Sequence, residues 1–352
     1  MVKVGLIGFG LAGQAFHAPV IRGVEGMELA CVLERHTNKS RERYPEVRVA
    51  RNMDEMLSDK TIELIVVATP NDSHYSYTKT ALLAGRHVVV DKPLTPTLRE
   101  AEELVKLAAE KKRLITVYQD RRFDGEFATV KEMVKNGTLG EILEFESRFD
   151  RFRLDPKPGA WREVADFPAA GVLWDLGPHV LDQALVLFGE PETITASAFC
   201  QRKTATVDDS FDVAMVYPRT RALLRAHIVA YAPGPHFMIH GTKGTFEKRG
   251  MDPQEEILRS DKYPDGKDWG PNWGIEPEAN SGLLSLVGEQ PRRVKSARGD
   301  YRNFYANVRD AIEKGVELEV TPQQALRTMR ALCLAHKSSR EKRTVRWDEP
   351  VD

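Results

Sequence analysis

The sequence has few of the features that would place a protein outside the cell or in a membrane. Its three cysteines, Cys31, Cys200 and Cys333, are widely spaced and odd in number, so neither a disulfide framework nor a structural zinc site is expected. No apolar run approaches the roughly 18 residues of a membrane span. The first apolar residues lead straight into a glycine, which leaves no room for a signal peptide. These absences predict a cytoplasmic protein.

An excess of charge of one sign is also missing. The chain has 51 Lys and Arg residues against 52 Asp and Glu, a formal net charge of −1. A near-neutral chain has no broad electrostatic attraction to nucleic acid or to an anionic membrane, so neither is expected as a partner. With 352 residues, the chain is too long for one ordinary core and suits two domains.

The first third of the chain alternates short apolar runs with segments of helical period. Strands are expected over residues 2–7, 28–33, 62–69, 87–90 and 114–118, and helices from the first glycine turn to Gly23 and over 53–57, 76–83 and 97–110. This alternation is typical of a parallel sheet that helices cover on both faces. It predicts an α/β, doubly wound Rossmann domain over residues 1–120.

The pattern changes after about residue 120. Residues 142–152 alternate polar and apolar, with Leu143, Phe145 and Phe149 expected on one face. Further strands are expected at 193–200, 211–217, 222–230 and 237–240, without helices between them, whereas 252–299 is expected to form loops. Helices are expected at 127–135, 303–314 and 322–340. The sequence therefore predicts a second, α+β domain over 121–352 with a large, mainly antiparallel sheet.

A glycine-rich motif stands between the first strand and the first helix. Gly8-Phe9-Gly10-Leu11-Ala12-Gly13 fits GxGxxG in the context that gives this pattern meaning. Gly8 permits a tight turn, Gly10 lets the backbone approach a pyrophosphate, and Gly13 lets the helix pack closely. The N–H groups at the start of the helix, around Leu11 and Ala12, are available to phosphates. The motif predicts a nicotinamide dinucleotide cofactor.

The end of the second strand gives opposing signals about the cofactor. Glu34 follows Gly13 by about 20 positions, where an acidic side chain accepts hydrogen bonds from the adenine ribose and repels the 2′-phosphate of NADP. Arg35, His36 and Lys39 follow at once and are suited to bind that phosphate, although solvent-exposed charge is an equally open interpretation. The balance favours NAD slightly, and NADP stays open.

The next strand ends in Thr69-Pro70-Asn71, and His74 follows near an expected helix start. In a doubly wound sheet the ligand lies at the carboxyl ends of the strands, so these residues are candidates for contact with the cofactor. An isolated histidine such as His74 is more often structural than catalytic.

Two further motifs lie downstream. Asp91-Lys92-Pro93 ends a strand, and Asp175 and His179 are spaced as DxxxH in the apolar segment 171–182. Together with the glycine motif, they resemble the Gfo/Idh/MocA family of sugar and cyclitol dehydrogenases over essentially the whole chain. Segments 118–124, 149–153 and 240–244 resemble its scyllo-inositol and polyol dehydrogenase branch. Asp91 replaces the more frequent glutamate, and Ala169-Ala170 stands where glycines are common.

The resemblance implies hydride transfer between nicotinamide and a secondary alcohol or ketone of a sugar or polyol, without a metal. Lys92 would bind the cofactor region, stabilise the developing alkoxide and exchange protons. His179 would be the general base, since the ordinary pKa of histidine lies near neutrality. Asp175 would hold a substrate hydroxyl and orient the histidine. Because Pro178 is poorly tolerated within a helix, an irregular turn is expected at 171–177 and a helix from Pro178 onward.

The remaining candidates are also read through the resemblance. Trp161-Arg162 resembles a pair that approaches the cofactor in some relatives, and Asp91 is a candidate for contact with the cofactor as part of its own motif. Arg121, Arg122 and Arg151 are candidates for binding substrate hydroxyls or a phosphate, with ordinary salt bridges equally open. Relatives pair through the second domain, so a homodimer or homotetramer is expected. Two alternatives stay open: internal redox chemistry on a tightly held NAD, or a non-catalytic NAD(P)-sensing regulator.

Overall fold

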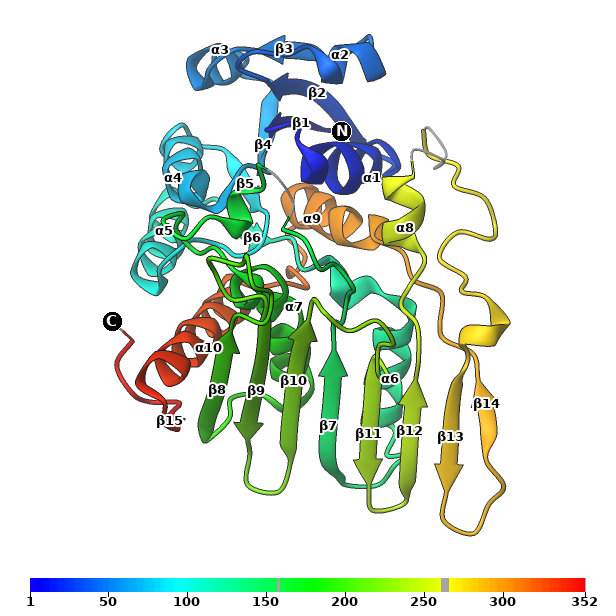
Figure 1. Cartoon of the computed structure of the whole chain (residues 1–352). Coiled ribbons are helices and arrows are strands. Elements are labelled where there is room, and N and C mark those ends of the chain that lie inside the picture. Colours follow the sequence, from blue (N-terminus) through cyan, green and yellow to red (C-terminus); the bar gives the residue numbers. More distant parts are fainter. Residues whose placement is uncertain (157–158, 261–265, 352) are drawn as a thin grey trace. The chain divides into compact units, whose positions relative to one another are not determined.

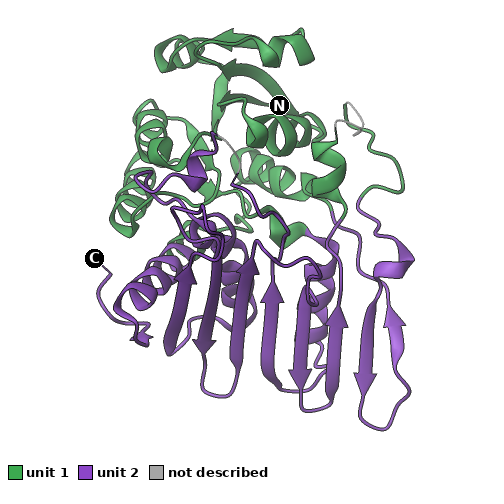
Figure 2. Ribbon diagram, viewed as in Figure 1, with its two compact units in different colours: residues 1–123, 253–273, 300–326 green, residues 124–252, 274–299, 327–352 purple. Residues whose placement is uncertain are grey.

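The computed structural model describes residues 1–156, 159–260 and 266–351 and separates into two compact units (Figure 2). Unit 1 comprises Met1–Phe123, Pro253–Trp273 and Asp300–Leu326, and unit 2 comprises Asp124–Asp252, Gly274–Gly299 and Arg327–Asp352. The sequence predicts a single boundary near residue 120, whereas two later segments cluster with unit 1. Residues 261–265, within the region expected to form loops, lie outside the described residues.

Unit 1 is built on a six-stranded sheet in which every neighbouring pair is parallel. Its order is β3-β2-β1-β4-β5-β6, the order of the doubly wound dinucleotide-binding fold, so the predicted Rossmann domain is confirmed. The strands are β1 (Val2–Ile7), β2 (Met27–Leu33), β3 (Arg48–Ala50), β4 (Ile62–Val67), β5 (His87–Val90) and β6 (Ile115–Val117). Strand β3 was not predicted, because three residues beginning with an arginine give no apolar run.

The helices of unit 1 pack on both faces of this sheet. They are α1 (Ala18–Arg22), α2 (Lys39–Arg43), α3 (Met53–Ser58), α4 (His74–Leu83), α5 (Leu98–Lys111), α8 (Gln254–Arg259) and α9 (Arg302–Lys314). Helix α1 contacts β2 and α9, and α4 contacts β5 and α5 (Figure 1). From Gly13, the last residue of the glycine motif, to His17 the chain forms a π-helix that leads into α1. One core cluster joins the first strands to Trp269, Trp273, Tyr301 and Tyr305 from the later segments.

Unit 2 is built on a nine-stranded sheet in the order β14-β13-β12-β11-β7-β10-β9-β8-β15. Among its described pairs, β7–β10 alone is parallel, so the predicted mainly antiparallel sheet is confirmed. The strands are β7 (Ile142–Arg148), β8 (Thr193–Phe199), β9 (Ser210–Val216), β10 (Arg221–His227), β11 (Phe237–Gly241), β12 (Gly244–Lys248), β13 (Gly282–Leu286), β14 (Arg292–Val294) and β15 (Val345–Arg346). The loop prediction for 252–299 was wrong at α8, β13 and β14, whose short runs are hidden among Pro, Gly and charged residues.

Helices cover one face of this sheet, and no helix of the described residues covers the other, which we call the open face. Helices α6 (Gly125–Lys135), α7 (Val172–Phe188) and α10 (Pro322–Glu341, in unit 2 from Arg327) lie along one face (Figure 1). Along β9 and β10, residues facing the helices are buried and alternate ones are partly exposed. On the open face, Arg225 pairs with Asp212 at 3.0 Å and with Glu146 at 3.3 Å. The open face thus carries charged side chains.

The predicted alternation in β7 was wrong at its first residues. Ile142 pairs with Gly241 and Glu144 with His240, so the ladder skips Leu143 in a β-bulge. Leu143 is exposed while Phe145 is fully buried, although a strict period of two places them on the same face.

Helix α7 begins at Val172, not at Pro178 as predicted. Its first N–H groups are bound by Asp208: Val172 N donates to the Asp208 carbonyl at 2.9 Å, and Leu173 N donates to Oδ2 at 2.7 Å. This cap starts the helix early, and Pro178 is accommodated inside it. Gly177, which precedes the proline, has no Cβ to crowd the proline ring.

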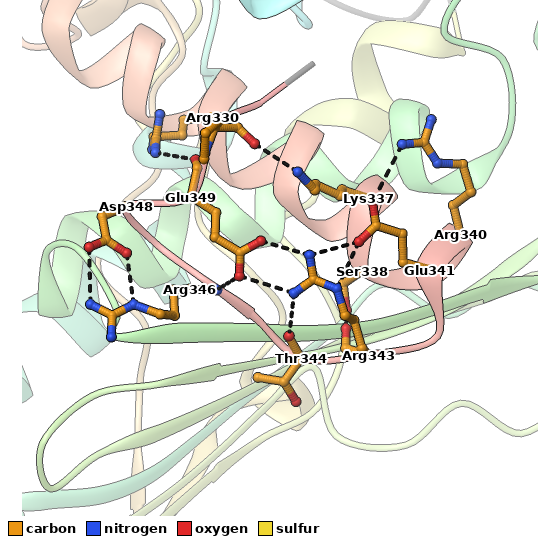
Figure 3. A network of polar contacts seen from close by, with 11 residues as sticks. Arg330, Lys337, Ser338, Arg340, Glu341, Arg343, Thr344, Arg346, Asp348 and Glu349 are labelled. Atoms are coloured by element: carbon orange, nitrogen blue, oxygen red, sulfur yellow. Dashed lines mark hydrogen bonds and ion pairs between the residues drawn. The ribbon is translucent and has the colours of Figure 1, made fainter.

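After α10 the chain turns back on itself and its last segment is tied down by ion pairs (Figure 3). Arg343 pairs with Glu341 at 2.7 Å and with Glu349 at 2.8 Å, and Arg330 donates to the Trp347 carbonyl at 2.8 Å. The hydrogen bonds from Arg343 hold the pKa of Glu349 well below its ordinary value, at about 2. Within the described residues, no helix combines the length and apolar character needed to cross a membrane.

Candidate functional site

The glycine motif forms a cradle that the side chain of any residue other than glycine would fill. A Cβ on Gly8 would lie 2.6 Å from the Ala68 carbonyl oxygen, and the φ of +94° at Gly8 also requires glycine. A Cβ on Gly13 would lie 2.3 Å from the Gly8 carbonyl oxygen. Around Gly10 no described atom lies within 4 Å of that position, which leaves the backbone open to a ligand. The cradle fits a dinucleotide pyrophosphate at the start of a helix.

Glu34, the residue after β2, is already bound within its own loop. Its carboxylate accepts from Ser40 N at 2.8 Å, from Lys39 N at 3.1 Å, and from the hydroxyls of Ser40 and Thr37. Burial opposes its charge, but these hydrogen bonds hold its pKa below the ordinary value. Glu34 therefore organises the loop that carries Arg35, and Arg35 itself is exposed.

The segments after β4 and β5 lie side by side, since Val67 pairs with Val90. One carries Thr69-Pro70-Asn71 and the other Asp91-Lys92-Pro93, whose Lys92–Pro93 peptide is cis. Lys92 is half-buried, and its N–H donates to Asp91 Oδ1 at 2.8 Å. His74 contacts both segments: Nδ1 lies 2.8 Å from the Pro93 carbonyl oxygen and Nε2 lies 2.9 Å from that of Thr69. The structure thus brings together the predicted residues of both strand ends.

Two residues near Lys92 were missed in the sequence analysis. His17, the last residue of the π-helix, is fully buried with Nδ1 2.6 Å from Tyr305 Oη and Nε2 4.0 Å from Asp91 Oδ2. Burial, against the nearby Asp91, lowers the pKa of His17 to about 4, so it is neutral at pH 7. Burial raises the pKa of Asp120, which also interacts with Lys92. The available signals were a lone histidine on an apolar helix and an acidic residue just after a strand.

Arg121 and Arg122 are both buried within unit 1. Arg121 pairs with Glu255 and donates to Tyr301 Oη at 3.1 Å. Arg122 donates to the Glu319 carbonyl at 2.9 Å and to Gln324 Oε1 at 2.8 Å. The ion pair with Glu255 favours the salt-bridge interpretation for Arg121, whereas these two contacts of Arg122 are hydrogen bonds to neutral oxygens.

In unit 2, helix α7 presents Asp175 and His179 one turn apart, on the same side. Asp175 Oδ1 pairs with Arg162 Nε at 3.0 Å, and the Arg162 guanidinium lies over the Trp161 ring at 4.2 Å. The Arg162 carbonyl also accepts from Gly171 N, just before the helix begins. The structure therefore joins the Trp161-Arg162 pair to the DxxxH motif, a link that the sequence did not predict.

His179 and the guanidinium group of Arg151 both contact the ring of Phe149. Its imidazole stacks on Phe149 with centroids 5.9 Å apart, and the Arg151 guanidinium lies 5.0 Å from the centre of the same Phe149 ring. Unit 2 thus gathers a carboxylate, an imidazole and two guanidinium groups from α7, the Trp161 segment and the end of β7. Such a set can bind hydroxyl groups and exchange protons.

Residues 2–119 match the profile of the oxidoreductase family with an NAD-binding Rossmann fold, and residues 127–247 match the GFO/IDH/MocA C-terminal domain. A nicotinamide-binding Rossmann unit joined to this second domain defines a class of oxidoreductases. The chain belongs to the Gfo/Idh/MocA family.

Several relatives match the chain along nearly their whole length. It is 38% identical to the Escherichia coli oxidoreductase YdgJ over 348 residues, with 98% of each chain covered. It is 34% identical to the scyllo-inositol 2-dehydrogenase (NADP(+)) IolW of Bacillus subtilis, covering 98% of this chain and 95% of that protein. The solved structure of the oxidoreductase yvaA from Bacillus subtilis superposes with a TM-score of 0.91 at 32% identity, covering 98% of both chains.

Proposed function

We propose that this protein is a cytoplasmic NADP-dependent dehydrogenase that interconverts a secondary alcohol and a ketone on a cyclitol or related polyol. The observation that carries the proposal is the Arg162–Asp175 pair, which stands one turn from His179 on α7. A polyol offers several hydroxyl groups, and an ion-paired carboxylate beside an imidazole suits both holding and deprotonating them. The full-length similarity to a scyllo-inositol dehydrogenase supports the same substrate class.

In this mechanism Asp175 accepts a hydrogen bond from a substrate hydroxyl, and Arg162, whose Nε lies 3.0 Å from Asp175 Oδ1, orients that carboxylate. His179 accepts the proton from the reacting hydroxyl as general base. We assign to Lys92 of unit 1 the role of the cation that stabilises the developing alkoxide. When bound, the nicotinamide would supply the hydride acceptor or donor. Its pyrophosphate would be held by Gly8, Gly10, Leu11, Ala12 and Gly13, and the nearby wall would be formed by Thr69, Pro70, Asn71 and Asp91.

The preference for NADP rests on the loop after β2. The sequence favours NAD slightly because of Glu34, but the Glu34 carboxylate already accepts hydrogen bonds from Thr37, Lys39 and Ser40. It is therefore less available to ribose hydroxyls. Arg35 and Lys39 are exposed beside it and are suited to a 2′-phosphate. We expect Arg35→Ala to increase KM for NADP by a much larger factor than KM for NAD.

We also propose that the open face of the unit 2 sheet pairs two copies into a homodimer, with a tetramer as the alternative. An antiparallel sheet with one face covered leaves the other to be covered by water or by a partner. Light scattering that returns one chain mass, 39.7 kDa, at micromolar concentration would contradict this.

The test of the main proposal follows absorbance at 340 nm with NADP or NAD and a panel of inositols, aldoses and sugar phosphates. A substrate-dependent rise that Lys92→Met abolishes, while cofactor binding persists, is the expected result. Cofactor that co-purifies with the protein, and no net reduction on any substrate, would favour internal redox chemistry. Cofactor binding without any turnover would favour the regulatory alternative.

A further inference from the structure

His74 has an unusual set of hydrogen-bonding partners. It is the first residue of α4 and is fully buried. Nδ1 lies 2.8 Å from the Pro93 carbonyl oxygen, and Nε2 lies 2.9 Å from the Thr69 carbonyl oxygen. Both ring nitrogens therefore face backbone oxygens at hydrogen-bonding distance.

A backbone carbonyl oxygen can only accept a hydrogen bond. A neutral imidazole carries one N–H and one lone pair, so it can donate to only one of these two oxygens. In the neutral form the other nitrogen would set its lone pair against a carbonyl lone pair inside the protein, where an unfavourable polar contact is costly. An imidazolium has two N–H groups and satisfies both contacts.

We propose that His74 is doubly protonated in the folded protein and acts as a positioning residue, donating one hydrogen bond to Thr69 and one to Pro93. Thr69 opens the segment assigned to the cofactor wall, and Pro93 follows Lys92. A cationic clamp between the two carbonyls sets the spacing of these segments and with it the place of Lys92. This role of the clamp rests on the proposed function of Lys92, whereas the protonation state of His74 does not.

Some features around His74 oppose a positive charge on its ring, and others favour it. Burial and the position at a helix N-terminus oppose a positive charge on His74. The two carbonyl dipoles favour it, because hydrogen bonds from a charged donor are the stronger kind. The titratable groups that neighbouring elements bring to this end of α4 are Asp72 before it, Asp91 and Lys92 after β5, and His17.

Groups on α5 complete this list. Glu100 at its start accepts from Thr97, Glu103 accepts from Tyr75 Oη at 2.6 Å on the exposed side, and Arg99 pairs with Glu103. The remaining charges of α5 are Glu102, Lys106, Glu110 and Lys111, and β4 and β5 contribute Glu63 and His87 at their far ends. Asp91 is the carboxylate that shares the strand-end edge with the clamp, and it favours a positive charge there.

The first experiment is a nitrogen-15 NMR titration of the full-length protein labelled at histidine, with the His74 signal assigned by its loss in His74→Gln. We expect both ring nitrogens of His74 to show imidazolium shifts at pH 7, while those of His17 show a neutral ring. A neutral tautomer of His74 at pH 7 would overturn the assignment of charge, whatever the substrate of the enzyme.

The second experiment compares three variants by kcat, KM and the pH dependence of kcat. His74→Phe keeps the volume and loses both donors, and we expect kcat to fall roughly 100-fold, as for a small misplacement of a catalytic group. His74→Gln keeps a neutral donor, and we expect a smaller loss and a shift in the high-pH limb of kcat. Tyr75→Phe, the neighbouring residue on α4, is the control and should leave all three quantities unchanged.

A purely structural role for His74 gives a different result. Both His74 variants would then unfold at lower temperature, while kcat and its pH profile in the folded protein stay at the wild-type values, and the positioning role would be refuted. If wild-type protein turns over no substrate, cofactor affinity by fluorescence titration replaces kcat. The clamp then predicts weaker cofactor binding in His74→Phe than in Tyr75→Phe, and equal binding would refute it.

Discussion

The two sheets of this molecule follow the same two-residue period and yet differ in sequence. In β4 of unit 1, Leu64, Ile65, Val66 and Val67 are consecutive and all fully buried, because helices cover both faces of the parallel sheet. In β10 of unit 2, burial alternates: Ala222, Leu224 and Ala226 are buried and the residues between them are partly exposed. The hydrophobic pattern of a strand therefore indicates how many of its faces are buried. It is a weaker indicator of whether the segment is a strand at all.

The largest expected effect tests this difference directly. Leu64→Ala and Ile65→Ala in β4 should each lower the free energy of unfolding by about 2–5 kcal/mol, because both side chains are buried. In β10, Leu224→Ala should cost the same, whereas Leu223→Ala should cost less than about 1 kcal/mol. Urea unfolding followed by circular dichroism measures all four. Equal losses at Leu223 and Leu224 would mean that the open face is as fully covered as the other.

Substitutions at two glycines of the cofactor cradle should distinguish an effect on folding stability from an effect on cofactor binding. Gly13→Ala places a methyl group against the Gly8 carbonyl and should destabilise unit 1 by about 1–3 kcal/mol as well as weaken cofactor binding. Gly10→Ala meets no described atom, so thermal unfolding without cofactor should match the wild type. Its cofactor affinity should still fall by about tenfold or more, a loss of about 1.4 kcal/mol. A Gly10→Ala protein that binds cofactor normally would show that the cradle is not where the pyrophosphate lies.

The interior of unit 2 should give a pH signature that Glu126 causes. Burial, with the neighbouring Asp252, raises the pKa of Glu126 to about 7, so its folded state holds a proton that the unfolded state releases near pH 4.5. The stability that Glu126 contributes is present below pH 4.5 and is lost as pH rises to about 7. Glu126→Gln keeps the neutral form at every pH.

We therefore expect Glu126→Gln to match the wild type near pH 4.5 and to exceed its free energy of unfolding by roughly 1–3 kcal/mol at pH 8. His17 in unit 1 has the opposite sign, because its lowered pKa costs stability as pH falls below 6.5. Denaturant unfolding at several pH values measures both trends. If the free energies of unfolding of Glu126→Gln and the wild type differ by the same amount at pH 5 and pH 8, Glu126 is not protonated in the folded protein at pH 5.

The smallest expected effect on folding concerns the open face. Asp212→Asn breaks a partly exposed ion pair with Arg225 and should change the free energy of unfolding at low protein concentration by less than about 1 kcal/mol. If this face pairs two copies, the same substitution should shift the monomer–dimer equilibrium in analytical ultracentrifugation. A change in folding with none in association would locate the subunit contact elsewhere.

The sequence predicted what depends on near neighbours. The glycine motif and the alternation of strands and helices in unit 1 follow from short patterns. It did not predict contacts that depend on distant partners: Asp208 starts α7 from 35 residues away, and His74 reaches Pro93 across 19. The hydrogen bonds that Glu34 accepts were not predicted for a related reason, since their donors lie in a loop whose conformation the pattern does not specify. Strands β13 and β14 were missed because their apolar residues are too few to show a period.

The interleaved order of the two units has a consequence for synthesis on the ribosome. The core of the nucleotide-binding unit combines strands that are synthesised early in translation with four residues that are synthesised late: Tyr301, Phe304, Val308 and Val320. At about 5–20 residues per second, residues 124–326 take roughly 10–40 s to appear after Phe123. During that interval the nascent Rossmann sheet lacks one of its covering helices and exposes apolar surface. Chaperone binding should therefore be concentrated on chains that end between Phe123 and α9.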